Sequence, residues 1–169
     1  FGLGARPHAK THKTAAIAKL QLAAGALGIC TAKVSEAEVL MAAGIERICM
    51  TTSNTSKSKI QRALALSRRS PEFIHAVDEP GNARDLSEAA KAAGLTASVV
   101  VDVAVGTRSG IPAADALALA QTIDRLPNLR LRGLLSYDGG AQHITGFATR
   151  KAKALDNIAR QGVPVPDLD

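Results

Sequence analysis

Short apolar segments alternate with longer amphipathic segments along the whole chain. The tripeptide AAG occurs at residues 23–25, 42–44 and 92–94, and an apolar segment follows each copy within a few residues. A glycine just after a helix supplies the left-handed turn that ends it. The pattern therefore predicts a repeated unit of helix, glycine stop and strand.

The periodicity of the apolar positions predicts six strands and six helices. The strands are expected near residues 5–10, 27–31, 47–51, 73–77, 97–103 and 129–136, with a further short strand from about Val163. The helices are expected near residues 13–24, 35–43, 57–69, 82–93, 112–126 and 144–161. At the start of the second helix, Ser35 and Glu38 have the spacing of a capping box.

Strands that alternate with helices through short connections are typical of a parallel α/β sheet. The nearly continuous apolar strand SVVVDV agrees with this class, because strands of parallel sheets are covered on both faces. Two architectures fit, an open doubly wound sheet and a closed (β/α)8 barrel of the TIM type. A complete barrel needs about 250 residues. The 169 residues therefore form either an open sheet or an incomplete part of a barrel.

Composition narrows the classes of partner. Hydrophobic residues make up 46% of the chain and aromatic residues 2%, so the core is expected to be aliphatic. The formal charge is +6, and the densest basic stretch lies on the helix expected at 57–69. Few aromatic side chains are present to stack on bases, so the pattern disfavours a nucleic-acid partner and leaves a basic α/β binding module as an alternative.

The chain has no apolar run long enough to span a membrane, so no membrane partner is expected. Cys30 and Cys49 lie in apolar segments and are interpreted as small buried side chains. Two cysteines agree with a reducing, cytoplasmic location.

In both candidate architectures, ligands bind at the carboxyl ends of the parallel strands. The polar side chains expected there are His8, Lys10, His12, Thr31, Lys33, Thr51, Thr52, Ser53, Asn54, His75, Asp78, Asp102, Thr107, Arg108, Ser136, Tyr137, Asp138, Gln142 and His143. Folding alone does not require so many polar groups at one edge of a sheet. The sequence therefore predicts a functional site at this edge.

The segment RPHAKTHKTA at residues 6–15 offers several kinds of chemistry. His8 and His12 could bind a metal if a helix began at about Pro7, but no carboxylate pair or third ligand completes such a site nearby. GLGARP lacks the third glycine of a dinucleotide loop, and no serine lies in a GxSxG motif. A lysine at a strand end, shielded from water, can instead act as a nucleophile toward a carbonyl carbon.

Four ordered motifs then resemble one enzyme family. They are RPHAKTHKT at 6–14, GICTAKVSEAEVLMAAGI at 28–45, VVVDVAVGTRSGI at 99–111 and LRGLLSYDGGAQHITGF at 131–147. Together they are similar to the D-threonine aldolase and D-serine dehydratase family. That family consists of pyridoxal-phosphate enzymes of fold type III, whose barrel is related to the N-terminal domain of alanine racemase. The resemblance favours the incomplete barrel over the open sheet.

The resemblance implies roles for individual residues. Lys10 carries pyridoxal 5'-phosphate covalently, and His8 supports it together with His12. Arg108 contacts the phenolic oxygen of the cofactor, and Tyr137 lies beside its ring. His143 acts on the hydroxyl group of the substrate. Lys13 begins the following helix and has no special role.

Two motifs depart from the family pattern. Ala32 stands where the family often has glutamine, and DVAVGTR stands where DVGMNR is usual. The resemblance also implies a glycine-rich phosphate loop and a C-terminal β-domain with a divalent metal (Mn, Mg or Zn), neither of which is recognised in residues 1–169. No metal ligand is assigned in this sequence, and residues 1–169 are interpreted as a portion of the barrel domain.

The implied function is a lyase acting on small D-3-hydroxy amino acids, by retro-aldol cleavage of substrates such as D-threonine into glycine and an aldehyde. The alternatives are a dehydratase of D-serine or D-3-hydroxyaspartate, an amino-acid racemase, and a non-catalytic carrier of the same cofactor. The family resemblance further implies a homodimer.

Overall fold

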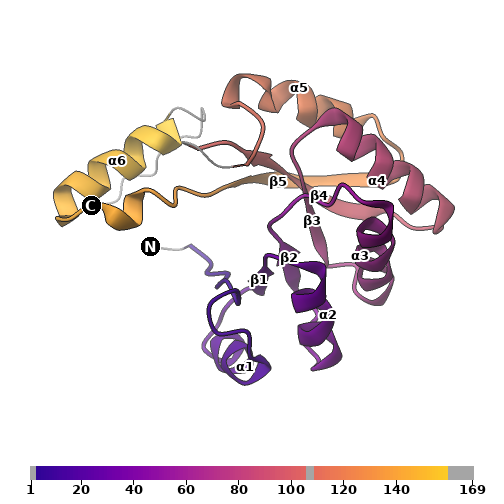
Figure 1. Ribbon diagram of the computed structural model, residues 1–169, viewed down its shortest axis with the longest axis horizontal. Helices are drawn as coiled ribbons and strands as arrows, with labels where there is room; N and C mark the ends of the chain where they lie inside the picture. The colour runs from indigo at the N-terminus through magenta and orange to yellow at the C-terminus, as the bar shows by residue number, and fades with distance from the viewer. Residues whose placement is uncertain (1–2, 106–108, 160–169) are drawn as a thin grey trace.

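The computed structural model describes residues 3–105 and 109–159 of the chain. They form one parallel sheet of five strands, in the order in which the strands occur in the sequence (Figure 1). The strands are β1 (Ile29–Thr31), β2 (Ile48–Met50), β3 (Ile74–Val77), β4 (Ala97–Val103) and β5 (Leu129–Ser136). The helices are α1 (Ala15–Ala23), α2 (Val34–Ala42), α3 (Lys57–Arg69), α4 (Pro80–Ala92), α5 (Ala113–Asp124) and α6 (Phe147–Ala159), with a short 3-10 helix η1 (Ala141–His143).

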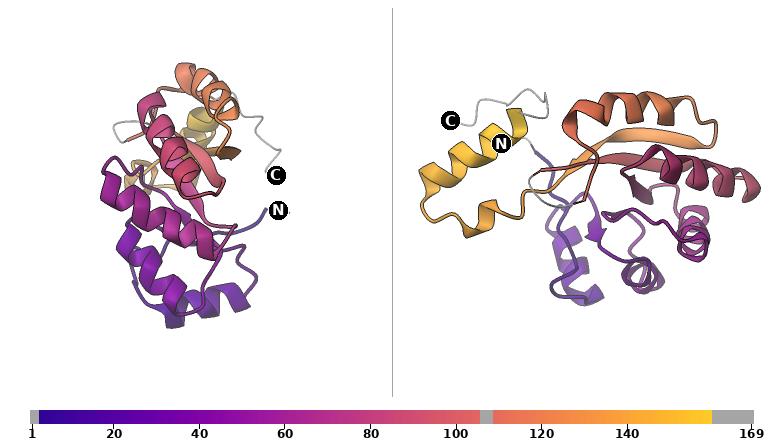
Figure 2. Two further views of the ribbon diagram at one scale, coloured as in Figure 1. Left: turned by 90° about the vertical axis from the view of Figure 1, so that its right-hand side faces the viewer. Right: turned by 45° about the horizontal axis from the view of Figure 1, so that its top comes forward.

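The strand order excludes the open doubly wound sheet. In that fold the chain reverses the direction in which strands are added, and helices cover both faces. Here every strand is added on the same side of the previous one, and right-handed connections then place their helices on one face. Figures 1 and 2 show α2 to α5 following this outer face, with α6 beyond the carboxyl end of β5. The described residues thus form an arc of a (β/α)8 barrel, as the sequence predicts.

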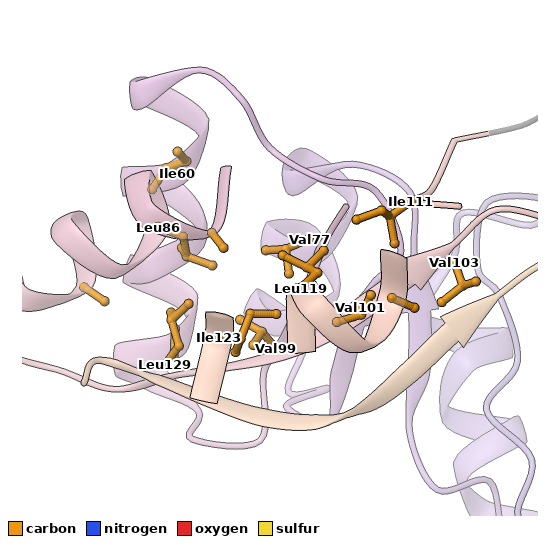
Figure 3. Close-up of a cluster of buried hydrophobic side chains, with 14 of the residues drawn as sticks. Ile60, Val77, Leu86, Val99, Val101, Val103, Ile111, Leu119, Ile123 and Leu129 are labelled. Carbon is orange, nitrogen blue, oxygen red and sulfur yellow. The ribbon is translucent and has the colours of Figure 1, made fainter. Parts of the chain in front are cut away.

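The main core lies between the sheet and the helices outside it. In Figure 3, Val99, Val101 and Val103 of β4 point toward Leu119 and Ile123 of α5. All seven residues of β4 are buried, which explains why this strand reads as almost entirely apolar. A smaller apolar cluster of Cys49, Ala76 and Val100 covers the inner face.

The glycine stops are confirmed, since Gly25, Gly44 and Gly94 all have positive φ angles, of 98°, 89° and 65°. The capping box is wrong, because α2 begins at Val34 with Lys33 before it. The side chain of Glu36 instead accepts a hydrogen bond from the backbone N–H of Ala32, at 2.9 Å.

The strand expected at residues 5–10 is shorter than predicted. Only His8 forms a parallel bridge, to Cys30, and the chain then turns through residues 9–12. The alternation of side chains therefore ends before His12. The further strand expected from Val163 lies outside the described residues.

Strand β5 contains a bulge that the alternating pattern does not predict. Leu131 pairs with Val99 and Gly133 pairs with Val100, so Arg132 is an extra residue opposite β4. Gly133 has a φ angle of 139°, which glycine adopts without strain. The extra residue moves Leu135 from the outer to the inner face, where it packs against the small inner cluster. The next residue on that face is Tyr137.

Candidate active site

A cavity of about 320 Å³ opens at the carboxyl ends of the strands, on the inner side of the sheet. Its lining comes from the N-terminal segment and from the ends of β1, β2, β4 and β5. The lining residues are Arg6, His8, Cys30, Thr51, Thr52, Asp102, Ser109, Leu135, Ser136 and Tyr137. This is the edge of the sheet at which the sequence predicts a functional site.

Lys10 is not among the lining residues, but its side chain reaches Tyr137, which is. The amine nitrogen of Lys10 lies 4.7 Å from the centre of the Tyr137 ring. The face of an aromatic ring carries partial negative charge, which attracts the ammonium group of lysine. Lys10 lies in the turn after His8, and Tyr137 follows β5, so two strand ends distant in the sequence place an amine against an aromatic face.

His8 connects the lysine turn to the end of β2 through a chain of hydrogen bonds. The backbone N–H of Lys10 donates to His8 Nδ1 at 3.1 Å, so the ring proton lies on Nε2. His8 Nε2 then donates to Thr51 Oγ1 at 3.2 Å, and the Thr51 hydroxyl donates to the Thr31 carbonyl at 3.2 Å. Burial lowers the pKa of His8, and the nearby charge of Lys10 lowers it further, against an opposing effect of Glu36. The neutral ring is the form that this chain of hydrogen bonds requires.

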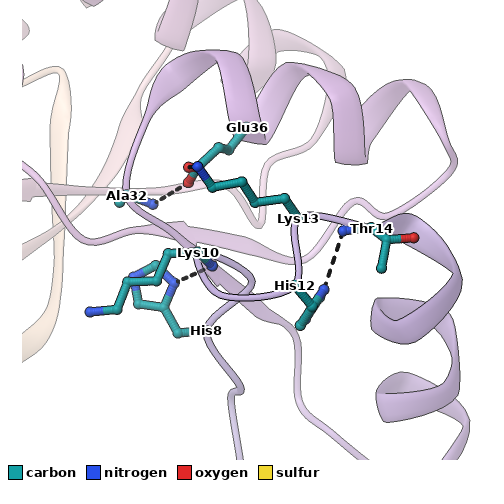
Figure 4. Close-up of polar contacts among 7 residues, drawn as sticks. All are labelled: His8, Lys10, His12, Lys13, Thr14, Ala32 and Glu36. Carbon is teal, nitrogen blue, oxygen red and sulfur yellow. Dashed lines mark hydrogen bonds and ion pairs between the residues drawn. The ribbon is translucent and has the colours of Figure 1, made fainter.

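Lys13 and His12 lie on the other side of the turn (Figure 4). Lys13 has a φ angle of 48°, and its amine lies 3.7 Å from a carboxylate oxygen of Glu36. His12 Nδ1 accepts a hydrogen bond from the backbone N–H of Thr14, at 3.2 Å. His12 therefore does not share a face with His8 and Lys10, as an extended strand would require. The structure thus separates the two lysines: Lys10 lies over the Tyr137 ring, and Lys13 pairs with the Glu36 carboxylate.

Asp102 places a carboxyl group in the wall of the cavity. It is buried near the end of β4, and its Oδ2 accepts a hydrogen bond from the Ser109 hydroxyl at 3.4 Å. Burial, reinforced by the charge of Asp78, raises its pKa from 3.8 to about 6. Such a group changes its protonation state close to neutral pH.

The structure describes the position of His143 but not that of Arg108. His143 is exposed in η1, within 3.4 Å of the Gln142 side-chain amide, and is not among the residues that line the cavity. Arg108 and Thr107 lie outside the described residues. The roles implied for His143 and Arg108 stay predictions.

Other strand-end residues lie apart from the cavity. Lys33 lines a separate hollow beside α2, together with Lys13 and Glu36. His75 is buried outside the barrel interior, where its Nε2 is 2.7 Å from the hydroxyl of Ser67. Burial lowers the pKa of His75 to about 4, so it is a neutral structural residue.

Sequence reasoning missed four lining residues, Arg6, Cys30, Ser109 and Leu135. Arg6 and Cys30 come before the strand ends rather than after them, and Leu135 reaches the cavity only because of the bulge. The glycine inside the strand at position 133 was the available signal of that bulge.

No cluster of three or more His, Cys, Asp or Glu side chains within residues 3–105 and 109–159 has the arrangement of a metal site. Among the same residues, none of the helices combines the length and the apolar character needed to cross a bilayer.

The described residues form an arc of a parallel barrel, with a lysine at the strand ends and an aromatic ring facing it. The protein therefore belongs to the class of (β/α)8-barrel proteins that have their functional site at the carboxyl ends of the strands. Comparison with known proteins then gives the family. Residues 6–164 match the family model described as alanine racemase, N-terminal domain, and the chain belongs to this family.

Its relatives include several lyases. The chain is 34% identical to a 3-hydroxy-D-aspartate aldolase of Paracoccus denitrificans, over 99% of this chain and 44% of the relative. It is 32% identical to a D-threo-3-hydroxyaspartate dehydratase of Delftia sp., over 98% of this chain and 47% of the relative. The crystal structure of a D-threonine aldolase from Filomicrobium marinum superposes with a TM-score of 0.88 at 40% identity, over 94% of this chain and 44% of that chain. The chain thus spans less than half the length of each of these proteins.

Proposed function

We propose that this chain is part of the cofactor-binding barrel of a pyridoxal-phosphate-dependent carbon–carbon lyase that acts on D-3-hydroxy amino acids. The reaction is retro-aldol cleavage, which converts a D-threonine-type substrate into glycine and an aldehyde. The observation that carries this proposal is the position of Lys10, whose amine lies 4.7 Å from the ring of Tyr137, a residue that lines the cavity. The named aldolase relatives support the same reaction class.

The residues present fit pyridoxal phosphate. This cofactor is a flat, anionic pyridine aldehyde, so it needs an amine, an aromatic or apolar wall and positively charged groups. Lys10 supplies the amine, and Tyr137 and Leu135 supply the wall. Arg6 also lines the cavity, with its guanidinium donating to the Arg47 carbonyl at 3.1 Å. Lys10 would hold the cofactor covalently, and Arg108 is the residue proposed to bind its phenolic oxygen. The bound cofactor supplies an electron sink for the bond that breaks.

The other residues have two roles: some orient Lys10, and one takes a proton from the substrate. His8 fixes the backbone of Lys10 through its Nδ1, and Thr51 fixes the His8 ring. His143, which follows Tyr137 on the segment leaving β5, takes the proton from the β-hydroxyl of the substrate. Removal of that proton allows the bond between Cα and Cβ to break, and the oxygen then becomes the carbonyl of the aldehyde product.

A dehydratase is the second candidate, and the Delftia relative favours it. The same visible residues serve both reactions, and what differs is the group that faces the substrate hydroxyl. If either reaction uses a divalent metal, the residues that bind the metal are expected to lie outside this sequence. A homodimer in the cytoplasm is the proposed state of the whole protein.

Two measurements test the proposal. The purified protein is supplied with pyridoxal phosphate and reduced with borohydride, and peptide mass spectrometry then locates the cofactor. Labelling of Lys10 supports the proposal, and a protein that takes up no cofactor, or binds nucleic acid in a salt-sensitive way instead, contradicts it.

The second measurement follows the products formed from D-threonine. Glycine and acetaldehyde identify the aldolase, and 2-oxobutanoate with ammonia identifies the dehydratase. Conversion of a D-amino acid into its L-enantiomer identifies a racemase, and cofactor binding without any product identifies a carrier.

A further inference from the structure

The two cysteines of the chain lie side by side on the inner face of the barrel arc. Cys30 of β1 and Cys49 of β2 are direct partners in the parallel register. Side chains of paired residues in neighbouring strands point to the same face of a sheet. Cys49 belongs to the small inner cluster with Ala76 and Val100, and Cys30 packs against that cluster. Both thiols are free.

The backbone spacing suits a bridge between them. Neighbouring strands lie about 4.7–4.9 Å apart, and a disulfide joins residues whose Cα atoms are about 4.4–6.8 Å apart. Cys30 and Cys49 can therefore be joined without a large movement of the backbone.

The two thiols differ in access and in acidity. Cys30 is half-buried and lines the cavity, whereas Cys49 is buried and is not among the lining residues. The neighbouring Cys49 thiol, acting as a hydrogen-bond donor, is the main cause that lowers the pKa of Cys30. The guanidinium of Arg6 lowers it further, while burial opposes both. The same hydrogen bond, together with burial, raises the pKa of Cys49.

We propose that Cys30 and Cys49 form an oxidisable thiol pair that reacts with hydroperoxides entering the cavity. The Cys30 thiolate attacks the peroxide oxygen, the O–O bond breaks, and the products are a sulfenic acid on Cys30 and an alcohol or water, which takes its proton from solvent. The Cys49 sulfur then attacks the Cys30 sulfur, its proton leaves with the hydroxyl as water, and a disulfide forms. In total, two thiols are oxidised and one peroxide is reduced.

The pair is connected directly to the lysine turn. The Cys30 N–H donates to the carbonyl of Pro7 at 2.7 Å, and the Cys30 carbonyl accepts from the N–H of Ala9 at 2.8 Å. Even a small movement of Cys30 toward Cys49 is therefore transmitted through these two hydrogen bonds to the segment that carries Lys10. A consequence, which rests on the proposed function, is that the oxidised protein takes up less cofactor at Lys10 than the reduced protein.

The test treats the purified protein with hydrogen peroxide and maps its cysteines by peptide mass spectrometry. We expect a bridge between Cys30 and Cys49 within one chain, with the loss of two hydrogens, and full recovery of both thiols with dithiothreitol. In Cys49→Ala, Cys30 should stop at a sulfenic acid that dimedone traps. In the matched variant Cys30→Ala, Cys49 should stay reduced.

Several results would overturn the proposal. They are survival of both thiols, a bridge only between separate chains, oxidation of Cys30 without any bridge, and reaction of Cys49 in the Cys30→Ala variant. The peptide map of the unmodified protein decides the matter even if a variant fails to fold. Thiol mapping does not involve Lys10, so its outcome is separate from that of the borohydride labelling that tests the proposed function.

Discussion

The amine of Lys10 lies 4.7 Å from the centre of the Tyr137 ring, although the two residues come from opposite ends of the described chain. A lysine over an aromatic face gains about 0.5–2 kcal/mol, depending on its access to water. This contact spans the inside of the barrel arc, because Lys10 follows the segment beside β1 and Tyr137 follows β5. It fixes an amine beside Tyr137, a residue that lines the cavity.

Lys10 and Lys13 should respond differently to substitution. Lys10→Ala removes the amine beside Tyr137, so we expect it to lose both covalent cofactor and measurable lyase activity. Lys13→Ala removes the exposed partner of an ion pair with the largely buried Glu36, so cofactor content should be unchanged and the free energy of unfolding should fall by about 1 kcal/mol. Borohydride labelling and urea denaturation of both variants make the comparison. Equal loss of cofactor in the two variants would refute the assignment of Lys10.

The His8 ring should titrate below its ordinary value of 6.5, because burial and Lys10 both disfavour its charge. Between pH 6.5 and the lowered pKa of the folded protein, His8 is protonated in the unfolded chain but still neutral in the folded protein. Stability should therefore decrease as the pH falls below about 6.5 toward the lowered pKa. A titration of His8 followed by NMR measures the value directly.

Variants separate the two causes of the His8 shift. Lys10→Ala should raise the pKa of His8 only in part, because burial is the larger cause. Lys13→Ala, whose charge is not a cause of the shift, is the matched control. A full return to 6.5 in Lys10→Ala would show that burial contributes little.

Asp102 should make the folded protein less stable at alkaline pH than at acidic pH. Its pKa in the folded protein is about 6 against 3.8 ordinarily, so the folded state holds the proton more tightly. The cost of the charged carboxylate appears as the pH rises from 3.8 and is complete above about 6. Asp102→Asn removes that cost, and we expect it to raise the free energy of unfolding at pH ~8 by about 1–2 kcal/mol, after allowance for screening by solvent in the cavity.

Chemical denaturation across the pH range tests this expectation for Asp102. The gain from Asp102→Asn should shrink steadily as the pH falls and be small near 3.8. Asp78→Asn removes the negative charge that is the second cause of the raised pKa, so the pKa of Asp102 should move part of the way back toward 3.8. A pH-independent gain in Asp102→Asn would point to packing rather than to charge.

Gly133 should be required for the bulge in β5. Its φ angle of 139° strains any other residue, whereas an added Cβ would meet no atom within 4 Å. We expect Gly133→Ala to lower the free energy of unfolding by about 1–3 kcal/mol through backbone strain alone. Arg132→Ala, at the exposed neighbouring position, should change it by less than about 0.5 kcal/mol. Thermal unfolding of both variants provides the measurement, and equal effects would contradict a special role for the glycine.

Much of the fold was predictable because its signals are local. The bounds of α3, β4 and β5 agree with the expected ranges, and the three AAG segments end helices with glycines of positive φ. The main failure concerns the first strand, whose pairing depends on contacts with a distant segment. The first strand was overestimated because alternation in RPHAKTHKT suits a strand, whereas only His8 has a pairing partner, and the chain turns immediately after it.

The sequence by itself determined the order of helices and strands, the aliphatic core and the kinds of side chain found at the strand ends, since periodicity and helix stops depend on neighbouring residues. Only the tertiary structure decided which of those side chains meet. The register of β5 against β4 inserts Arg132 and brings Leu135 to the inner face, and the curvature of the sheet brings Lys10 to Tyr137. Pairing of β1 with β2 places Cys30 beside Cys49. Register and curvature arise from contacts between distant segments, so no local pattern specifies them.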